Sequence, residues 1–314
     1  MKEQPMPLLD EGAHGVYVIA VTPFTEAGEL DLASVKTMVD FYLAAGADGL
    51  TVLGVMGEAP KLTADESVIF TRAVMAAVAG RVPVVVGVSS PGLAALTQLT
   101  QAAMAAGAAG VMVAPPHTLR TDDQILDYFR AVGSALGDVP FALQDHPQST
   151  GVQIGLSVLL RILKAVPNCV MIKHEDWPGL HKLDGLREAS ARGEIRRVSM
   201  LGGNGALFLP EELIRGSDGA MTGFGYPEMM VGICKAHAAG NLGRMWDLFE
   251  AYLPLARYEQ QPGLGLAVRK HILAKRGAIS SALVRRPGQN VSPRDISDVA
   301  ALVARQTERI MRLG

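Results

Sequence analysis

The residue of this sequence with the clearest capacity for chemistry is Lys173, which ends the apolar run Cys169-Val170-Met171-Ile172. A lysine at the end of a buried strand loses the hydration of its charged form, which favours the neutral amine, a competent nucleophile toward a ketone. Lys173 is therefore a candidate for imine (Schiff-base) formation with a carbonyl substrate. The other interpretation is structural: the aliphatic stem lies along the wall of the fold, and the ammonium group reaches solvent or pairs with Glu175.

Three further side chains are candidates for proton transfer or substrate binding beside Lys173. Side chains alternate along a strand, so Glu175 shares the orientation of Lys173, and Gln144 shares that of His146 on the preceding strand. Glu175 is a general base or a counter-ion, and His146, a residue type that titrates near neutral pH, is a base or an ordinary loop histidine. Gln144 cannot titrate, so we expect it to hold a substrate hydroxyl or a water molecule.

Strands must position these residues, and the sequence repeats a unit of helix and strand. The apolar strands follow a helix that ends at a glycine, as at Gly46 and Gly107, or a proline turn, as at Pro83. Continuously apolar strands are typical of a parallel sheet that is covered on both faces. The predicted strands are residues 16–21, 50–54, 84–88, 111–115, 141–145, 169–174, 197–201 and 220–224.

Helical patterns connect the strands and continue beyond the last one. Between strands they cover residues 32–43, 64–79, 93–106, 122–136, 156–165 and 180–191, with Thr63, Thr121 and Ser157 as expected N-caps. Eight strand units predict an α/β fold, a closed (β/α)₈ TIM barrel, that forms the catalytic domain over residues 1–228. Residues 229–314 have only helical patterns, at 229–239, 242–255, 264–276 and 292–313, and predict a C-terminal helical subdomain.

The composition excludes several classes of protein. The 314 residues include 29 Lys+Arg and 31 Asp+Glu, a net charge of −2 without a basic block, so neither nucleic acid nor a membrane is an expected partner. Gly and Pro divide the uncharged stretch 82–119 into a strand, a helix and a strand, which argues against a membrane span. Two cysteines without a CxxC motif, and histidines without ligand spacing, favour neither disulfides nor a metal site. Residues 1–14 lack the apolar core of a signal peptide, and we expect a cytoplasmic protein.

Five motifs lie in order along the chain on the expected strand ends. They are Thr22-Pro23-Phe24, Gly54-Val55-Met56-Gly57-Glu58, Pro147 with Gly151, Val170-Met171-Ile172-Lys173 and Gly219-Ala220-Met221-Thr222-Gly223. Together they resemble the dihydrodipicolinate synthase and N-acetylneuraminate lyase family of class I aldolases, dehydratases and synthases, over essentially the whole chain. The resemblance implies a catalytic imine at Lys173 without any other cofactor or metal, a small 2-keto acid substrate, and a homo-oligomer, usually a dimer of dimers.

The resemblance also implies where substrate binds. The implied residues are Val55, Met56, Gly57 and Glu58 after the second strand, His117 after the fourth, Gly203 and Asn204 after the seventh, and Met221 and Thr222 on the eighth. Family members usually have hydroxyl residues where this chain has Val55 and Met56, so we expect the keto-acid carboxylate to bind backbone amides around Met56 and Gly57. Glu58 is alternatively structural, as the cap of the helix that follows this loop.

The departures from the family bear on the reaction. This chain has Gln144 at the position of the family's proton-relay tyrosine and His117 near the position of a second relay tyrosine. It has Ser149 at the position of the arginine that binds aspartate semialdehyde in the family's synthases. These losses disfavour 4-hydroxy-tetrahydrodipicolinate synthase activity. The chain is more similar to the L-2-keto-3-deoxyarabonate dehydratase type, which shares Gln-Asp before the proline and Ala-Met-Thr-Gly on the eighth strand.

These features predict a lyase that dehydrates a 2-keto-3-deoxy sugar acid through an imine at Lys173. Glu175, or His146 with a water placed by Gln144, would remove the C3 proton. Retro-aldol cleavage proceeds through the same imine, so a pyruvate-dependent aldolase is an alternative. A non-catalytic sugar-acid-binding protein on the same barrel is another, which the missing tyrosine suggests and the retained Lys173 opposes.

Overall fold

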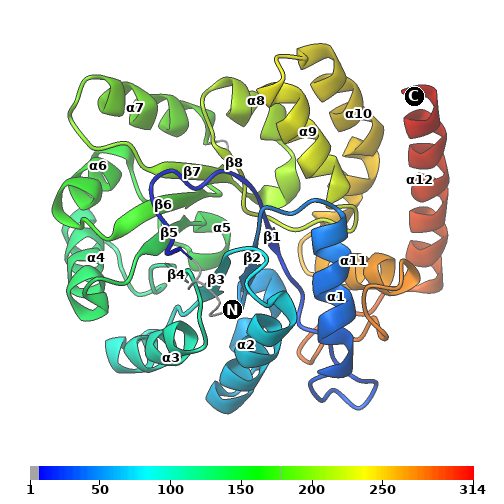
Figure 1. Cartoon of the computed structure of the whole chain (residues 1–314), viewed down its shortest axis with the longest axis horizontal. Helices are drawn as coiled ribbons and strands as arrows, with labels where there is room; N and C mark the ends of the chain where they lie inside the picture. Colours follow the sequence, from blue (N-terminus) through cyan, green and yellow to red (C-terminus); the bar gives the residue numbers. More distant parts are fainter. Residues whose placement is uncertain (1–6, 178) are drawn as a thin grey trace, which may run out of the picture.

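The computed structural model describes residues 7–177 and 179–314, and its centre is a closed barrel of eight parallel strands in chain order (Figure 1). Strand β1 closes the ring by pairing with β8. The predicted (β/α)₈ fold is therefore confirmed. Of residues 1–14, for which the sequence analysis expected no signal peptide, residues 1–6 lie outside the described residues. The strands are β1 (Gly15–Ile19), β2 (Gly49–Val52), β3 (Val84–Gly87), β4 (Gly110–Val113), β5 (Phe141–Asp145), β6 (Cys169–His174), β7 (Ser199–Gly202) and β8 (Gly219–Ala220).

Helices cover the outside of the barrel and extend beyond it. Three short 3₁₀ turns, η1 (Val55–Gly57), η2 (Ala59–Lys61) and η3 (Asn204–Ala206), shape the loops after β2 and β7. The helices are α1 (Ala33–Ala44), α2 (Ala64–Val78), α3 (Leu93–Ala105), α4 (Asp122–Leu136), α5 (Pro147–Thr150), α6 (Leu156–Ala165), α7 (Leu180–Ala191), α8 (Leu209–Ile214), α9 (Glu228–Ala238), α10 (Leu242–Glu259), α11 (Gly265–Lys275) and α12 (Pro293–Arg312).

The helix starts agree with two of the three predicted N-caps. Thr63 accepts from the N–H of Glu66 at 3.1 Å, and the Glu66 carboxylate accepts from the N–H of Thr63 at 2.9 Å, which completes the predicted capping box. Thr121 caps α4 in the same way. The prediction for Ser157 is wrong, because α6 begins at Leu156 and its N-cap is Gly155, which has no side chain to accept a hydrogen bond.

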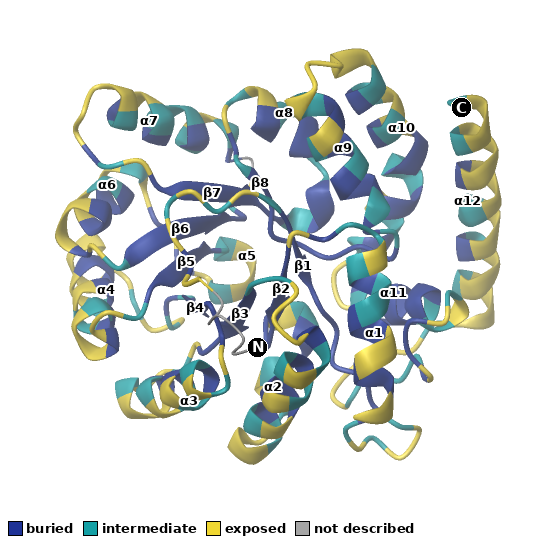
Figure 2. Ribbon diagram, viewed as in Figure 1, coloured by how far each residue is buried: buried dark blue, intermediate teal, exposed yellow. Residues whose placement is uncertain are grey.

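The C-terminal helices divide differently from the predicted boundary between residues 228 and 229. Helix α9 contacts β1 and α8, so it is the eighth helix of the barrel ring and not part of an appendage. Helices α11 and α12 each pack against α10, and α12 lies at the edge of the molecule with its outer face exposed (Figure 2). The helical extension of the barrel therefore consists of α10, α11 and α12.

The uncharged stretch 82–119 folds as β3, α3 and β4 with flanking loops, as predicted. Val85 and Met112 belong to a cluster inside the barrel, and most of the other apolar strand residues pack between the strands and the helices. In Figure 2 the strands are accordingly buried along their length. No helix in the described part of the chain has the length and hydropathy needed to cross a membrane.

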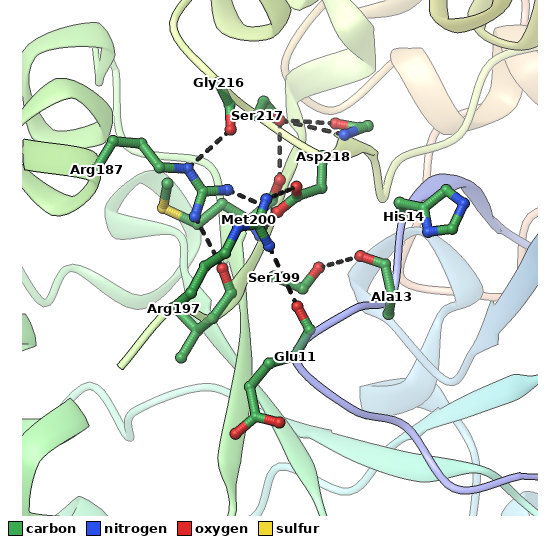
Figure 3. Close-up of polar contacts among 12 residues, drawn as sticks. Glu11, Ala13, His14, Arg187, Arg197, Ser199, Met200, Gly216, Ser217 and Asp218 are labelled. Carbon is green, nitrogen blue, oxygen red and sulfur yellow. Dashed lines mark hydrogen bonds and ion pairs between the residues drawn. The ribbon is translucent and has the colours of Figure 1, made fainter. Parts of the chain in front are cut away.

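An ionic network at the N-terminal face of the barrel holds the beginnings of β7 and β8 (Figure 3). Asp218, just before the two-residue strand β8, accepts from Arg187 at 2.6 Å and from the N–H of Met200 at 2.8 Å. Arg197 pairs with the other oxygen of the Asp218 carboxylate. The network lies at the end of the barrel where residues serve stability, opposite the expected catalytic face.

Candidate active site

Strand β6 places Lys173 inside the barrel at its catalytic end. The alternation of side chains puts Met171 and Lys173 on the inner face, and only 4% of Lys173 is exposed. Its Nζ lies 2.8 Å from Oε2 of Glu175. The ion pair that one interpretation of the sequence predicted is thus present, but it is buried in the barrel interior instead of lying at the protein surface.

Glu175 connects Lys173 to strand β5. Register pairs Gln144 with Lys173 across the two strands, and Nε2 of Gln144 donates to Oε2 of Glu175 at 2.8 Å. Burial acts to raise the pKa of Glu175, but the charge of Lys173, the nearby His146 and the hydrogen bonds outweigh burial, so this pKa lies below its ordinary value. At neutral pH Glu175 is therefore a carboxylate, the form that a general base requires.

His146 lies at the edge of this group. Its Nδ1 is 3.8 Å from Oε2 of Glu175 and 2.8 Å from Oγ of Ser149, a residue of the short helix α5. Burial, together with the charge of Lys173, lowers the pKa of His146, and the charges of Glu175 and Asp145 only partly oppose this shift. His146 is therefore neutral near pH 7. The four predicted catalytic residues lie together, and Ser149 joins them through a contact with His146 that the sequence analysis did not predict.

The loop after β2 only partly matches its predicted role in carboxylate binding. The N–H of Gly57 donates to the carbonyl of Gly54 at 3.0 Å, so it is occupied within the turn. The N–H of Met56 has no acceptor among the described residues, which makes Met56 the better donor to a carboxylate. Val55 is 45% exposed and lines a cavity at this end of the barrel.

Glu58 points away from the site. Its Oε1 pairs with Lys270 of α11 at 2.5 Å, and its Oε2 accepts from Lys61 at 2.9 Å and from the N–H of Arg285 at 2.9 Å. Its φ of 57° is left-handed, a conformation that costs free energy for a residue with a side chain. Glu58 makes no side-chain cap to the following turn, so the expected cap is wrong. The carboxylate instead stabilises the loop after β2 through its contacts with Lys270, Lys61 and the N–H of Arg285.

The loop after β7 forms the wall behind Glu175. A Cβ on Gly203 would lie 2.1 Å from Cγ of Glu175, so only glycine leaves room for this side chain. Asn204 donates from Nδ2 to the carbonyl oxygen of Glu175 at 3.1 Å. Thr222 accepts from the N–H of Gly205 at 2.9 Å, and Met221 belongs to the cluster inside the barrel. These four residues, which were predicted to bind substrate, lie around Glu175 and in the barrel interior. The side chains of Asn204 and Thr222, however, form hydrogen bonds with backbone groups of the protein.

A cavity of about 780 Å³ opens beside this group, at the C-terminal ends of β2 to β5, and runs between α2 and α3. Gln144, Ser149, Val55 and His117 line it. Lys173, the register partner of Gln144, is not among the lining residues. Apolar side chains dominate the lining, and Asp65 is its one charged residue, so the cavity suits an uncharged part of a ligand.

Within residues 7–177 and 179–314, no three His, Cys, Asp or Glu side chains are grouped to ligate a metal ion.

Known proteins resemble this chain along nearly its whole length. The sequence profile of the Dihydrodipicolinate synthetase family matches residues 13–306. An L-2-keto-3-deoxyarabonate dehydratase of Azospirillum brasilense is 32% identical over 302 residues, which are 95% of this chain and 96% of the relative. A 4-hydroxy-tetrahydrodipicolinate synthase of Thiobacillus denitrificans is 31% identical over 249 residues, 77% of this chain and 80% of the relative. The crystal structure of dihydrodipicolinate synthase from Rhodopseudomonas palustris is 46% identical, with a TM-score of 0.93, and covers 95% of this chain and 99% of that one.

Proposed function

Because the chain belongs to the dihydrodipicolinate synthetase family of lyases, we propose that it dehydrates a 2-keto-3-deoxy sugar acid of the 2-keto-3-deoxyarabonate type through an imine at Lys173. The observation that carries the proposal is the 2.8 Å contact between Nζ of Lys173 and Oε2 of Glu175. In an imine the substrate C3 is two bonds from this nitrogen. A carboxylate that contacts the nitrogen is therefore also within reach of the C3 proton.

The first step is the addition of the Lys173 amine to the C2 ketone, with loss of water, to give a protonated imine. The positive imine draws electrons from C3 and acidifies its protons. Glu175, held by the hydrogen bond from Gln144, takes one C3 proton and leaves an enamine. The enamine expels the C4 hydroxyl, which leaves as water once protonated, so the C3–H and C4–O bonds break and a C3–C4 double bond forms. Hydrolysis of the imine then frees the product and Lys173.

His146 and Ser149 are placed to relay to the leaving C4 hydroxyl the proton that Glu175 has taken from C3, since Nδ1 of His146 lies 3.8 Å from Oε2 of Glu175. Their side chains contact each other at 2.8 Å, and Ser149 lines the cavity where the distal part of a substrate would lie. The N–H of Met56 would donate a hydrogen bond to the substrate carboxylate. Gln144 lies where the family relay has a tyrosine, and it can hold a group but cannot exchange a proton. This difference favours dehydration over retro-aldol cleavage, which requires a base at the C4 hydroxyl.

Imine formation is tested by incubation with pyruvate or a 2-keto-3-deoxypentonate followed by borohydride reduction and peptide mass spectrometry. We expect one adduct, on Lys173, and none in a Lys173→Arg variant. An adduct on Lys270 or Lys182 instead would refute the assignment.

The product distinguishes the possible reactions. Dehydration of a panel of 2-keto-3-deoxy acids yields water and an unbroken carbon chain, whereas pyruvate plus an aldehyde would identify an aldolase. A second candidate is 4-hydroxy-tetrahydrodipicolinate synthase, which the 46% identity to the Rhodopseudomonas palustris protein favours. Condensation of pyruvate with aspartate semialdehyde at a rate above that of the dehydration would establish it.

A further inference from the structure

A second polar cluster lies directly behind the candidate active site. Asp145 stands between Gln144 and His146 on β5, and His174 stands between Lys173 and Glu175 on β6. Because side chains alternate, both point outward, toward α7 and α8, and both are at least 98% buried. The same two strand ends therefore carry one polar group on the inner face of the barrel and another on its outer face.

Helix α7 holds the outward side chains of this cluster. Lys182 donates to Oδ2 of Asp145 at 2.7 Å and also pairs with Asp176 at 2.7 Å. Nε2 of His174 donates to the carbonyl of Gly179 at 2.9 Å, and its Nδ1 is 3.8 Å from Oδ2 of Asp145. Oδ1 of Asp145 and Nδ1 of His174 have no hydrogen-bond partner among the described residues.

Glu212 of α8 completes the cluster from the other side of β7. A Cβ on Gly202 would lie 1.9 Å from Oε2 of Glu212, and one on Gly203 would lie 2.1 Å from Cγ of Glu175. Two consecutive glycines thus leave room for two carboxyl groups on opposite faces of one backbone segment. Glu212 is 6% exposed, and its Oε2 has no hydrogen-bond partner in the described structure.

The charge of Glu212 changes in the neutral pH range. Burial raises the pKa of Glu212 to about 7, with a small contribution from Glu211 and Glu175, while the charge of His174 opposes the shift. Burial acts to lower the pKa of His174, but the nearby Asp145, then Glu212 and the Gly179 carbonyl, outweigh it and raise this pKa. Cys234 of α9 is also near Glu212, and burial raises its pKa to about 12, so it stays a neutral thiol.

We propose that Glu212 is a positioning residue for Glu175: from the opposite face of the Gly202-Gly203 backbone, its ionisation sets how strong a base Glu175 is. This inference rests on the proposed function, in which Glu175 removes the C3 proton. Protonated Glu212 is a neutral group that packs on Gly202. Ionised Glu212 adds a second negative charge on the far side of the strand end, which disfavours the charge on Glu175 and makes it a stronger base.

The test uses pyruvate as the smallest 2-keto acid, because exchange of its methyl protons with deuterium reports C3 proton removal directly. NMR measures the exchange rate against pH for the wild type, Glu212→Gln and a matched control, Glu188→Gln, which removes an exposed carboxylate of α7. We expect the wild-type and control rates to rise by up to about twofold as the pH passes about 7, the size expected for a change of a few tenths of a unit in base pKa with a Brønsted slope of about 0.5. Glu212→Gln should lose this step and keep its borohydride adduct on Lys173.

A second measurement does not depend on turnover. Infrared difference spectra should show a buried carboxylic acid that titrates near neutral pH in the wild type and is absent in Glu212→Gln. An unchanged pH profile in Glu212→Gln, or a uniform loss of rate at every pH, would overturn the positioning role, as would a spectrum without such a titration. Absence of any adduct or exchange in the wild type would instead refute the proposed function.

Discussion

Lys173 with Glu175 at the end of β6, and Lys270 with Glu58 between α11 and the loop after β2, are both buried ion pairs of the same two residue types. Their Nζ–Oε distances are 2.8 Å and 2.5 Å. They differ in what else each partner contacts. Lys270 also donates to the carbonyl of Leu283 at 2.7 Å and lies 4.5 Å from the centre of the Phe24 ring. Among the described residues, Glu175 is the one ionic partner of Lys173.

The two carboxylates show the same contrast. Both oxygens of Glu58 are occupied, one by Lys270 and the other by Lys61 and the N–H of Arg285. In Glu175 the contacts converge on Oε2, and the side chain keeps 7% of its surface exposed. A pair whose hydrogen-bonding capacity is filled is a structural element, whereas a pair with capacity to spare can engage a substrate.

The pKa of a lysine does not by itself distinguish these roles. Burial lowers the pKa of Lys270 to about 8, although the charge and hydrogen bond of Glu58 oppose the shift. By this criterion Lys270 would be a good candidate for imine formation. Its side chain has no exposed surface, against 5% for Lys173, and its ammonium group is occupied by Glu58 and by the carbonyl of Leu283. Free bonding capacity, more than a lowered pKa, marks the reactive lysine.

The largest expected effect comes from removal of the Lys173 amine. Lys173→Met should abolish borohydride trapping and lower turnover by at least about 10⁴-fold, because the covalent nucleophile is gone. Chemical unfolding should show a smaller loss of stability than for Lys270→Met, since Glu175 keeps its hydrogen bond from Gln144. An equal or larger loss would show that Lys173 is a structural residue like Lys270.

Replacement of the carboxylate should separate proton removal from imine formation. Glu175→Gln should reduce turnover by ~10²–10⁴-fold, the usual contribution of a general base, while the reduced adduct on Lys173 still forms. Single-turnover kinetics and peptide mass spectrometry measure the two steps. Near-normal turnover would transfer the base role to His146.

Lys270→Met should reverse this pattern. Loss of Lys270 leaves Oε1 of the buried Glu58 carboxylate without a partner, which costs ~3–5 kcal/mol in the free energy of unfolding, measured with urea. Turnover per folded molecule should fall much less than in Glu175→Gln. The double variant Glu58→Gln with Lys270→Met should recover part of the lost stability, because it removes the uncompensated charge. Failure of the double variant to recover would mean that packing around Lys270, and not charge, holds the loop.

The smallest effect should follow from Lys61→Met. Lys61 is 20% exposed, and Glu58 keeps its contacts to Lys270 and Arg285 without it. We expect a loss of stability below about 1 kcal/mol, as for other partly solvated ion pairs. A loss as large as that of Lys270→Met would show that the carboxylate depends on all its partners together.

The sequence by itself determined the features that depend on local pattern. Apolar runs and the glycines between them predicted the strands, and the alternation of side chains placed Lys173 and Glu175 on one face. The boundaries were less certain: the predicted strand at residues 197–201 begins at Ser199, and Arg197 lies before it and pairs with Asp218. Thr63 and Thr121 were recognisable as caps because a capping box spans only four residues.

The tertiary structure alone decided which partners these residues have. Glu58 and Lys270 are 212 residues apart, and no local pattern relates them. The contacts of Gln144 with Glu175, and of Glu212 with the Gly202 backbone, depend on strand register and on how α8 packs. Sequence periodicity fixes the face on which a side chain lies, because that is a property of one strand or helix. Which group meets it across the barrel depends on how separate elements pack, and this packing decides whether a buried lysine is held inert or left free to react.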